Sequence, residues 1–536
     1  MRKIGSVFLR LFGKTPDEVI KEIYDKIPGE KVQRFKTVVV ISILTAVMDY
    51  FYLMINGYAG PDAICEGIYT YGGADNELRS LRWFIPFLNS YVGKNVVMPY
   101  VIVILYALMI AAAVFLISEM TGIVSMLPNV LMTAAMVSFP VVTRQYAYLF
   151  MALSYALSFL MVVLAGYFLR KRKVWSIVFG TVSLIIMFGC YQAYVAAAAS
   201  IVLFLFIFDM IKRRKVGQAF LDVCIYVVCG VIAGAANILI ANQRLLSRGL
   251  TAYERSNSFS VKESILFLKE TIGYCYQWLW LYYTENFLGR AKLYPLLILL
   301  VAAMTVYFVV SLCKEKRFAN AILLPVGIAV MPMAINLCAI LFPHNGVSMV
   351  MRYQYVILIP LAFLLANELP IKQVMSNMAR WLICMDVLAL IIGYSVTAIS
   401  TQIGYKIAYD ATETKANLIL ADVFDMEGYA PGKTKVILCG AVDWADGFIE
   451  NQQIFALSQV ESGPIFWNGV FGMRVCREKY FKNYLGVDLG FITGEEYLAV
   501  IKSQEFSEMP IWPEEGSIQW MGDSIVVKLT NNPPVY

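Results

Sequence analysis

Residues 189–215 read GCYQAYVAAAASIVLFLFIFDMIKRRK, which is a polar and aromatic tetrad, a long apolar run and then a basic cluster. The tetrad at 191–194 interrupts an apolar stretch that is otherwise too long for one crossing of a hydrocarbon core about 30 Å thick. We therefore expect one membrane span to end near residue 190 and the next to cover 192–211. The basic cluster at 212–215 is typical of the cytoplasmic side of a membrane.

The same alternation of apolar runs and basic connections continues in both directions along the chain. Hydrophobic residues make up 59% of the 536 and charged residues 15%, whereas a soluble domain has about 25% charged residues. The sequence thus predicts a mainly α, polytopic membrane protein with about eleven transmembrane helices. The predicted spans lie near 37–57, 97–118, 123–142, 146–169, 174–190, 192–211, 219–241, 293–313, 320–342, 350–368 and 380–400.

The positions of the basic clusters predict the orientation of these spans. Clusters at 170–173, 212–215 and 314–317 fall on one side of the membrane when eleven crossings are counted. This arrangement predicts a cytoplasmic amino terminus, with residues 1–36 as an amphipathic segment, and a transmembrane domain over 37–400. It also places the carboxy terminus and several longer connections outside the cytoplasm.

After residue 400 the sequence changes character and predicts a small α/β domain over 401–536. The segment KTKVILCG is typical of a buried strand, NQQIFALSQ and GEEYLAVIKSQ of helices, and MPIWPEEGSIQWMGDSIVVKL of a strand, a turn and a closing strand. Cys439 and Cys476 both lie in this extracytoplasmic domain. They are expected either to form a disulfide in an oxidising compartment or to be two buried thiols.

Composition also excludes several kinds of site. The net charge of +6 is modest and indicates no nucleic-acid-binding tail. A single histidine and ten scattered cysteines argue against a metal site built from His or Cys, so any metal would need carboxylate ligands. No Gly-rich phosphate loop follows a strand, which argues against a nucleotide-sugar-binding domain.

The first outer connection, residues 56–95, is unusually polar and aromatic. Asp62 and Glu66 are four residues apart, so both carboxylates project from one face if PDAICEG begins a short helix. Such a pair suits acid/base chemistry, and the alternative is a helix-terminal charge beside a solvated glutamate. Residues 75–77 are interpreted as a solvated turn. Before the next span, Arg82 is a candidate anion-binding residue or a snorkelling cation, and Trp83 a candidate interfacial anchor.

Further candidate residues gather at the other outer ends of the spans. Arg144 sits in a very short connection and Arg352 at the start of a late span, where a planar guanidinium suits a lipid phosphate. Polar or aromatic residues able to bind a sugar or acceptor are Tyr191, Gln192, Tyr194, Trp83, His344 and, within the first span, Asp49. Each of them could instead line a helix interface.

Two more features of the outer connections remain to be explained. Arg244 and Arg248 also lie there and break the rule that positive charge stays inside. The aromatic segment FLKETIGYCYQWLWLYYTENF is expected to lie along the membrane interface rather than to cross it. An aromatic belt without a ligand is the alternative interpretation of that segment.

In their order, these motifs resemble those of the bacterial O-antigen glucosyltransferase family, whose members have a GT-C-like architecture. The resemblance covers most of the membrane region and rests on YAGPDAICEG, SLRWFIPFL, GCYQAYVA and MRYQYVILIP. The chain departs from the family where it has Pro61-Asp62 in place of paired acidic residues. It departs again where Leu81-Arg82-Trp83 replaces Gly-Arg-Trp.

The resemblance implies that a hexose, glucose in this family, moves from a polyprenyl-phosphate carrier to a cell-surface acceptor glycan. Transfer would take place at the outer face of the bacterial inner membrane. Asp62, or Glu66 as the alternative, would act as the base of an inverting reaction. Arg144, Arg352 and Arg82 would stabilise the phosphate charge.

No cofactor is required by the sequence, although Mg²⁺ or Mn²⁺ could bridge Asp62 and the phosphate. The expected partners are the lipid-linked sugar, the acceptor glycan and membrane lipid, with no nucleic acid. Rival interpretations are a transporter of lipid-linked sugars and a polymerase or ligase of surface polysaccharide. A transporter predicts charged residues near mid-membrane, whereas the predicted spans are nearly free of charge. Asp49 in the first span is the exception, and toward the outer end of that span it is a possible second carboxylate of the site.

Overall fold

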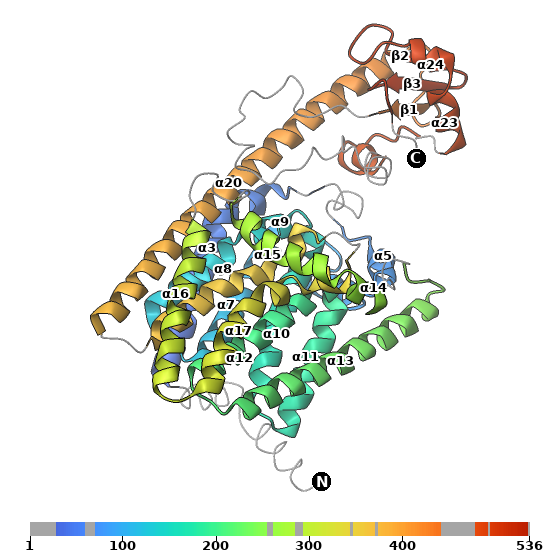
Figure 1. Cartoon of the computed structure of the whole chain (residues 1–536). Helices are drawn as coiled ribbons and strands as arrows, with labels where there is room; N and C mark the ends of the chain where they lie inside the picture. The colour runs from blue at the N-terminus through green and yellow to red at the C-terminus, as the bar shows by residue number, and fades with distance from the viewer. Residues whose placement is uncertain are drawn as a thin grey trace, which may run out of the picture.

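A long helix, α20 (Gln373–Phe424), carries a small α/β unit away from the edge of a bundle of apolar helices (Figure 1). This arrangement is seen in a computed structural model of the chain. The structure describes residues 28–58, 60, 70–253, 261–284, 293–343, 347–369, 373–440, 478–490 and 494–533.

Nine helices in the described part of the chain are long and apolar enough to cross a membrane. They are α3 (Gly29–Asn56), α7 (Pro99–Thr121), α8 (Met126–Ser138) with α9 (Pro140–Tyr146), α10 (Leu149–Leu169), η1 (Gln192–Tyr194) with α12 (Val195–Ile211), α13 (Val216–Ser247), α16 (Leu293–Lys314), α17 (Phe318–Ile335) and α20. The predicted class, a mainly α membrane protein, is confirmed.

The two remaining predicted spans correspond to shorter apolar helices. These are α11 (Val174–Cys190) and the combined segment of η4 (Tyr353–Ile357) and α19 (Leu358–Glu368). Every predicted span therefore has a helical counterpart. The count of eleven crossings is nevertheless not confirmed, because these two are shorter than the length expected of a span.

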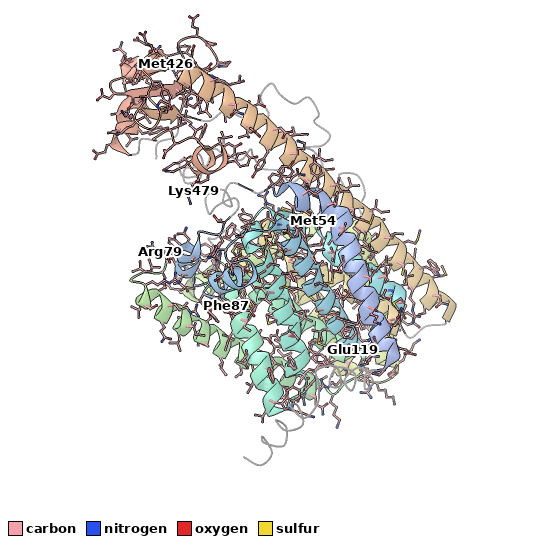
Figure 2. All side chains as sticks on the ribbon, turned by 180° about the vertical axis from the view of Figure 1, so that it is seen from behind. Met54, Arg79, Phe87, Glu119, Met426 and Lys479 are labelled. Atoms are coloured by element: carbon pink, nitrogen blue, oxygen red, sulfur yellow. The ribbon has the colours of Figure 1, made fainter. Side chains whose placement is uncertain are left out.

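Ion pairs between helix termini gather at one end of the bundle. Asp209 at the end of α12 pairs with Arg170, which follows α10, and with Arg214. Arg213 pairs with Glu315, which follows α16. We call this end, which contains all three basic clusters, the basic end, and the opposite end the far end. In Figure 2 Glu119 lies at the basic end, whereas Met54 and Arg79 lie toward the far end.

Two helix breaks near the far end follow directly from the sequence. Phe139 is forced out of the helical region (φ −53°, ψ 129°) because Pro140 follows it, so α8 ends and α9 begins there. Tyr191 is extended (φ −158°, ψ 107°) and separates α11 from η1. The second break confirms the prediction that the tetrad at 191–194 divides two helices.

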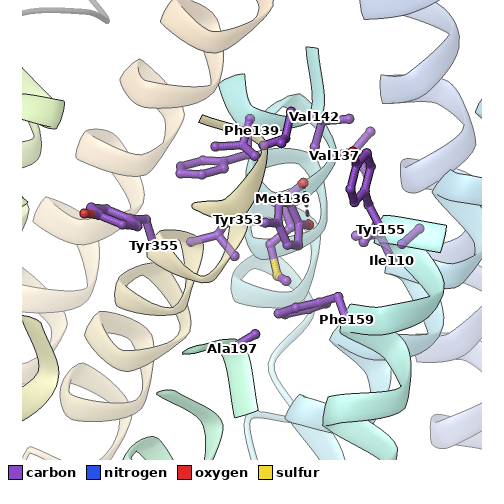
Figure 3. Close-up of a cluster of buried hydrophobic side chains, with 14 of the residues drawn as sticks. Ile110, Met136, Val137, Phe139, Val142, Tyr155, Phe159, Ala197, Tyr353 and Tyr355 are labelled. Carbon is purple, nitrogen blue, oxygen red and sulfur yellow. Dashed lines mark hydrogen bonds between the residues drawn. The ribbon is translucent and has the colours of Figure 1, made fainter. Parts of the chain in front are cut away.

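Tyrosine and phenylalanine side chains fill the core between these breaks (Figure 3). The Tyr353 hydroxyl donates to the carbonyl of Met136, a residue of α8, at 2.9 Å. The ring of Tyr353 packs edge-on against Phe159 of α10 at 4.8 Å and against Phe139 at 6.0 Å. These contacts fix the start of η4 against α8 and α10, and so determine where Arg352 lies.

Helix α20 has 52 residues, and therefore a length of about 78 Å, more than twice the thickness of a hydrocarbon core. Its carboxy-terminal part projects beyond the far end of the bundle (Figure 1). The helix runs without a break through residue 400 to Phe424. The small unit is thus joined to the bundle by helix rather than by a loop.

The small unit contains a three-stranded sheet of order β1-β3-β2. Strand β1 (Lys435–Cys439) pairs in parallel with β3 (Ser524–Lys528), which forms an antiparallel hairpin with β2 (Ile518–Met521). Helices α23 (Glu495–Ile501) and α24 (Gln504–Glu508) accompany the sheet. The described strands and the helix predicted from GEEYLAVIKSQ are confirmed. The predicted helix NQQIFALSQ and Cys476 lie outside the described residues, and Cys439 is buried in β1.

Candidate functional site

The connection between α3 and α7 folds over the far ends of other helices. It contains two short helices, α5 (Ala74–Arg79) and α6 (Phe84–Gly93). The backbone NH of Tyr253, beyond the end of α13, donates to the Arg79 carbonyl at 3.0 Å. The connection is thereby fixed to the far end of α13.

Arg82 is held between a carboxylate and an aromatic ring. Its Nη1 donates to Glu77 Oε2 at 3.0 Å, and its guanidinium carbon lies 4.6 Å from the centre of the Tyr191 ring. Burial, the largest single influence, would lower the pKa of Arg82, but the charge of Glu77, the neighbouring tyrosines and the hydrogen bond to Glu77 together raise it. The prediction that residues 75–77 form a solvated turn is wrong for Glu77, whose residue surface is only 7% exposed, because it pairs with this arginine.

Gln192 anchors the first connection to the helix break. Its side-chain nitrogen donates to the carbonyls of Ser80 and Leu81 at 3.0 and 2.9 Å. Because a primary amide has two donor hydrogens, both are used in these contacts. In this arrangement Gln192 positions the segment that precedes Arg82, and only its amide oxygen is left to contact another group.

Gln145 is a buried junction that the sequence reasoning did not single out. Its side-chain nitrogen donates to the Tyr194 hydroxyl and to the Val350 carbonyl, both at 3.0 Å, and its oxygen accepts from Tyr106 at 2.6 Å. Tyr194 is therefore buried and bonded within the core. The sequence does contain a signal for this junction, namely a glutamine beside Arg144 in an apolar setting. A buried amide is normally hydrogen-bonded, so such a glutamine indicates a polar contact inside the core.

The same junction brings Arg144 and Arg352 into one region. Arg144 precedes Gln145 in α9 and is buried, while Arg352 comes two residues after the Val350 carbonyl that Gln145 contacts. Arg352 Nη2 donates to the Val347 carbonyl at 2.9 Å, and its guanidinium carbon lies 4.3 Å from the Trp278 ring. Both predicted phosphate-binding arginines thus occupy the far end.

Trp278 belongs to α15 (Leu268–Thr284), which follows α14 (Val261–Leu266). In the described part of the chain α15 is not among the helices long and apolar enough to span a membrane. It packs beside α17 and α18 (Leu337–Leu341). The predicted aromatic segment continues past Thr284 into residues that the structure does not describe, so its position along the membrane interface stays a prediction.

Trp83 is enclosed by three neighbours. Its Nε1 donates to Asn237 Oδ1 at 2.8 Å, and the guanidinium carbon of Arg244 lies 5.3 Å from its ring. Its remaining side lies against Gly189, where an added Cβ would come within 2.7 Å of the ring. Trp83 consequently locks α6 onto α11 and α13.

Besides Asp209, which pairs with arginines at the basic end, two carboxylates of the described helical bundle are buried. Asp49 of α3 is 3% exposed, and the hydroxyls of Ser138 and Ser395 face it. Asp386 of α20 is 4% exposed, and its two oxygens have no hydrogen-bond partner among the described residues. The sequence reasoning had singled out Asp49 alone as a charge inside a span.

Asp62, Glu66 and His344 lie outside the described residues. The flanks of the segment that contains Asp62 and Glu66 are nevertheless well anchored. The Gly60 NH donates to the Ala147 carbonyl at 2.8 Å, and the Tyr71 NH donates to the Asn95 carbonyl at 2.7 Å. Ala147 directly follows α9, so the segment begins beside the helix that carries Arg144.

The described residues contain few groupings of metal-binding side chains. No cluster of three or more His, Cys, Asp or Glu side chains that could hold a metal ion occurs there. Asp62, where the sequence allows a carboxylate-held Mg²⁺ or Mn²⁺, lies outside the described residues. Metal binding at Asp62 therefore stays a prediction.

Comparison with known proteins identifies the chain. No curated protein matches it significantly. A family model described as glucosyl transferase GtrII matches residues 51–365, more than half of the chain. The matched region runs from the last turns of α3 to α19, so it includes the first connection, the helix break at Tyr191 and Arg352. The chain therefore belongs to the GtrII glucosyl transferase family and is a membrane glucosyltransferase.

Proposed function

We propose that the protein transfers glucose from a polyprenyl-phosphate carrier to a cell-surface glycan at the extracytoplasmic face of the bacterial inner membrane. One observation carries the proposal. In a glucosyl transferase the buried or half-buried arginines Arg82, Arg144 and Arg352 gather at the bundle end opposite the basic clusters. Arginine at that position suits a phosphate whose charge develops as the sugar leaves.

The orientation follows from charge. Basic connections stay in the cytoplasm, so the far end faces outward, together with the small α/β unit beyond α20. Nucleotide sugars are cytoplasmic substrates, and the sequence has no phosphate loop to hold one. A donor embedded in the membrane by its prenyl chain supplies glucose at the outer face without a nucleotide.

The chemistry is a displacement at the anomeric carbon. Asp62 removes the proton of the acceptor hydroxyl, whose oxygen forms the new glycosidic bond. The bond between the anomeric carbon and the phosphate oxygen breaks on the opposite face, and the phosphate leaves with the electron pair. Configuration is thereby inverted. Arg82, Arg144 and Arg352 stabilise the leaving charge, and Glu66 is the alternative base.

The test measures transfer of labelled glucose from polyprenyl-phosphate glucose to acceptor glycan in membranes with equal amounts of each variant. Asp62→Asn is expected to lower transfer by at least a hundredfold, the usual contribution of a positioned base, and Glu66→Gln far less. Glu413→Gln, which removes an exposed carboxylate of α20, is the control and should match the wild type. Chelation with EDTA, followed by addition of Mg²⁺ or Mn²⁺, tests whether Asp62 also holds a metal.

Three results would overturn the proposal. Unchanged transfer in both Asp62→Asn and Glu66→Gln would remove the carboxylates from the reaction. Movement of the lipid-linked sugar across the membrane, without transfer to any acceptor, would indicate a transporter instead. Formation of long polymers rather than single additions would point to a polymerase.

A further inference from the structure

Helix α13 presents an apolar surface along its length. Large side chains exposed on it include Val231, Ile232, Ile238, Leu239 and Leu246. In a membrane protein such a surface lies against lipid chains, because no neighbouring helix of the described bundle covers it. The far end of α13 therefore meets the head groups of one leaflet.

A cavity of about 240 Å³ opens at this end of α13. It is lined by Leu78, Pro86, Arg244, Ser247 and Arg248. A water molecule occupies about 30 Å³ of liquid, so the cavity has room for a tetrahedral phosphate and its water. Two of its five lining side chains are cationic and one carries a hydroxyl group.

The charge of the cavity is only partly neutralised. Arg248 pairs with Asp75 at 2.8 Å in an exposed ion pair. Arg244 is exposed, has no carboxylate partner among the described residues and rests on the Trp83 ring. Trp83 is itself fixed by Asn237, so the guanidinium of Arg244 is held in place by a rigid aromatic face.

We propose that this cavity binds the phosphate group of a membrane lipid, whose chains lie along the apolar surface of α13. A guanidinium binds phosphate oxygens through two parallel hydrogen bonds, and Arg244 has these donors available. The cationic residues of this site, Arg244 and Arg248, are not among the arginines assigned to the glucosyl-transfer site. Phosphate binding here also gives a reason for Arg244 and Arg248 to lie on the side of the membrane where the positive-inside rule disfavours basic residues.

The phosphate could come from two lipids, an anionic phospholipid or the prenyl phosphate of the sugar donor. The test therefore titrates the purified full chain, by native mass spectrometry in a neutral detergent, with phosphatidylglycerol, polyprenyl phosphate and diacylglycerol separately. Arg244→Gln is compared with the wild type. Arg244→Lys keeps the charge, and Lys94→Gln removes an exposed cation of the connection between α3 and α7 that does not line the cavity.

Arg244→Gln should weaken binding of a phosphate lipid about tenfold, as expected when a charged hydrogen bond is lost. Arg244→Lys should retain part of it, and Lys94→Gln should match the wild type. If Arg244→Gln binds only phosphatidylglycerol more weakly than the wild type, the cavity is a phospholipid site. If it binds only polyprenyl phosphate more weakly, the cavity is a donor site. The proposal would be overturned if Arg244→Gln bound both phosphate lipids as tightly as the wild type does. It would also be overturned if Arg244→Gln lost as much affinity for diacylglycerol, which has no phosphate, as for the phosphate lipids. Because no acceptor is present, the result is independent of glucosyl transfer.

Discussion

The guanidinium carbon of Arg82 lies 4.6 Å from the centre of the Tyr191 ring, so a cation of the first connection rests on the break between α11 and η1. Glu77 holds the same guanidinium from the other side at 3.0 Å. A cation over an aromatic face is stabilised by the ring quadrupole, and more so when water is excluded. The contact therefore joins the two sequence motifs that lie at the centre of the candidate site.

A double-mutant cycle measures this contact. Arg82→Gln and Tyr191→Leu should each lower the free energy of unfolding, and the two effects should be non-additive by about 0.5–2 kcal/mol. Unfolding is followed by denaturant titration of the purified chain in detergent micelles. Tyr191→Phe keeps the ring and should keep most of the coupling. Strict additivity of the Arg82→Gln and Tyr191→Leu effects would show that the contact contributes no energy.

Gln192→Glu should loosen the first connection although the side chain keeps its shape. A carboxylate cannot donate to the carbonyls of Ser80 and Leu81, so both lose their partner at a cost of about 1–3 kcal/mol each. Limited proteolysis should cut the connection faster, and transfer should fall. Gln277→Glu, at an exposed position of α15, is the control. A proteolysis rate equal to that of the wild type would refute the anchoring role.

Gly189→Ala should displace Trp83, because the new methyl group would lie 2.7 Å from its ring. Overpacking of this kind costs about 1–3 kcal/mol, and the bond from Trp83 to Asn237 would lengthen. Gly234→Ala is a matched control, since its methyl group would meet Phe188 at an ordinary 3.9 Å. The thermal midpoint in detergent should fall for Gly189→Ala only. Similar midpoints in both variants would mean that the ring has room to move.

Lys528→Met should destabilise the small α/β unit without affecting the bundle. The buried ammonium donates to the carbonyls of Phe506, Ser507 and Met509 at 3.0, 3.1 and 2.6 Å. Methionine fills a similar volume but leaves these carbonyls unsatisfied, which should cost about 2–4 kcal/mol. Protease cleavage confined to residues 425–536 is the readout, with exposed Lys502→Met as the control. Full resistance of Lys528→Met would contradict the structural role.

Asp386→Leu should stabilise the bundle, because it removes a buried carboxylate that has no hydrogen-bond partner among the described residues. The expected gain in unfolding free energy is about 1–3 kcal/mol. Denaturant titration measures it, and Asp410→Leu, at an exposed position of the same helix, should show no gain. A loss of stability in Asp386→Leu would show that the carboxylate has a partner in the folded protein.

The helices of the bundle could be predicted closely, whereas the contacts of the candidate site could not. The break at Tyr191 follows from the length of the apolar run around it, and the end of α8 from Pro140. In contrast, Glu77 looked like part of a solvated turn until folding placed Arg82 against it. Gln145 was not singled out from the sequence, although it connects α7, η1 and η3 (Met349–Met351).

The sequence by itself determined that this chain is a membrane protein, where its helices lie and which of its ends is basic. It could do so because lipid offers no hydrogen bonds, so each crossing segment must satisfy its own backbone and carry its own apolar side chains. The tertiary structure alone decided that Arg82 meets Tyr191, that Trp83 is enclosed and that Arg244 lines a cavity. Those contacts join residues distant in sequence, and only the packing of whole helices brings such residues together.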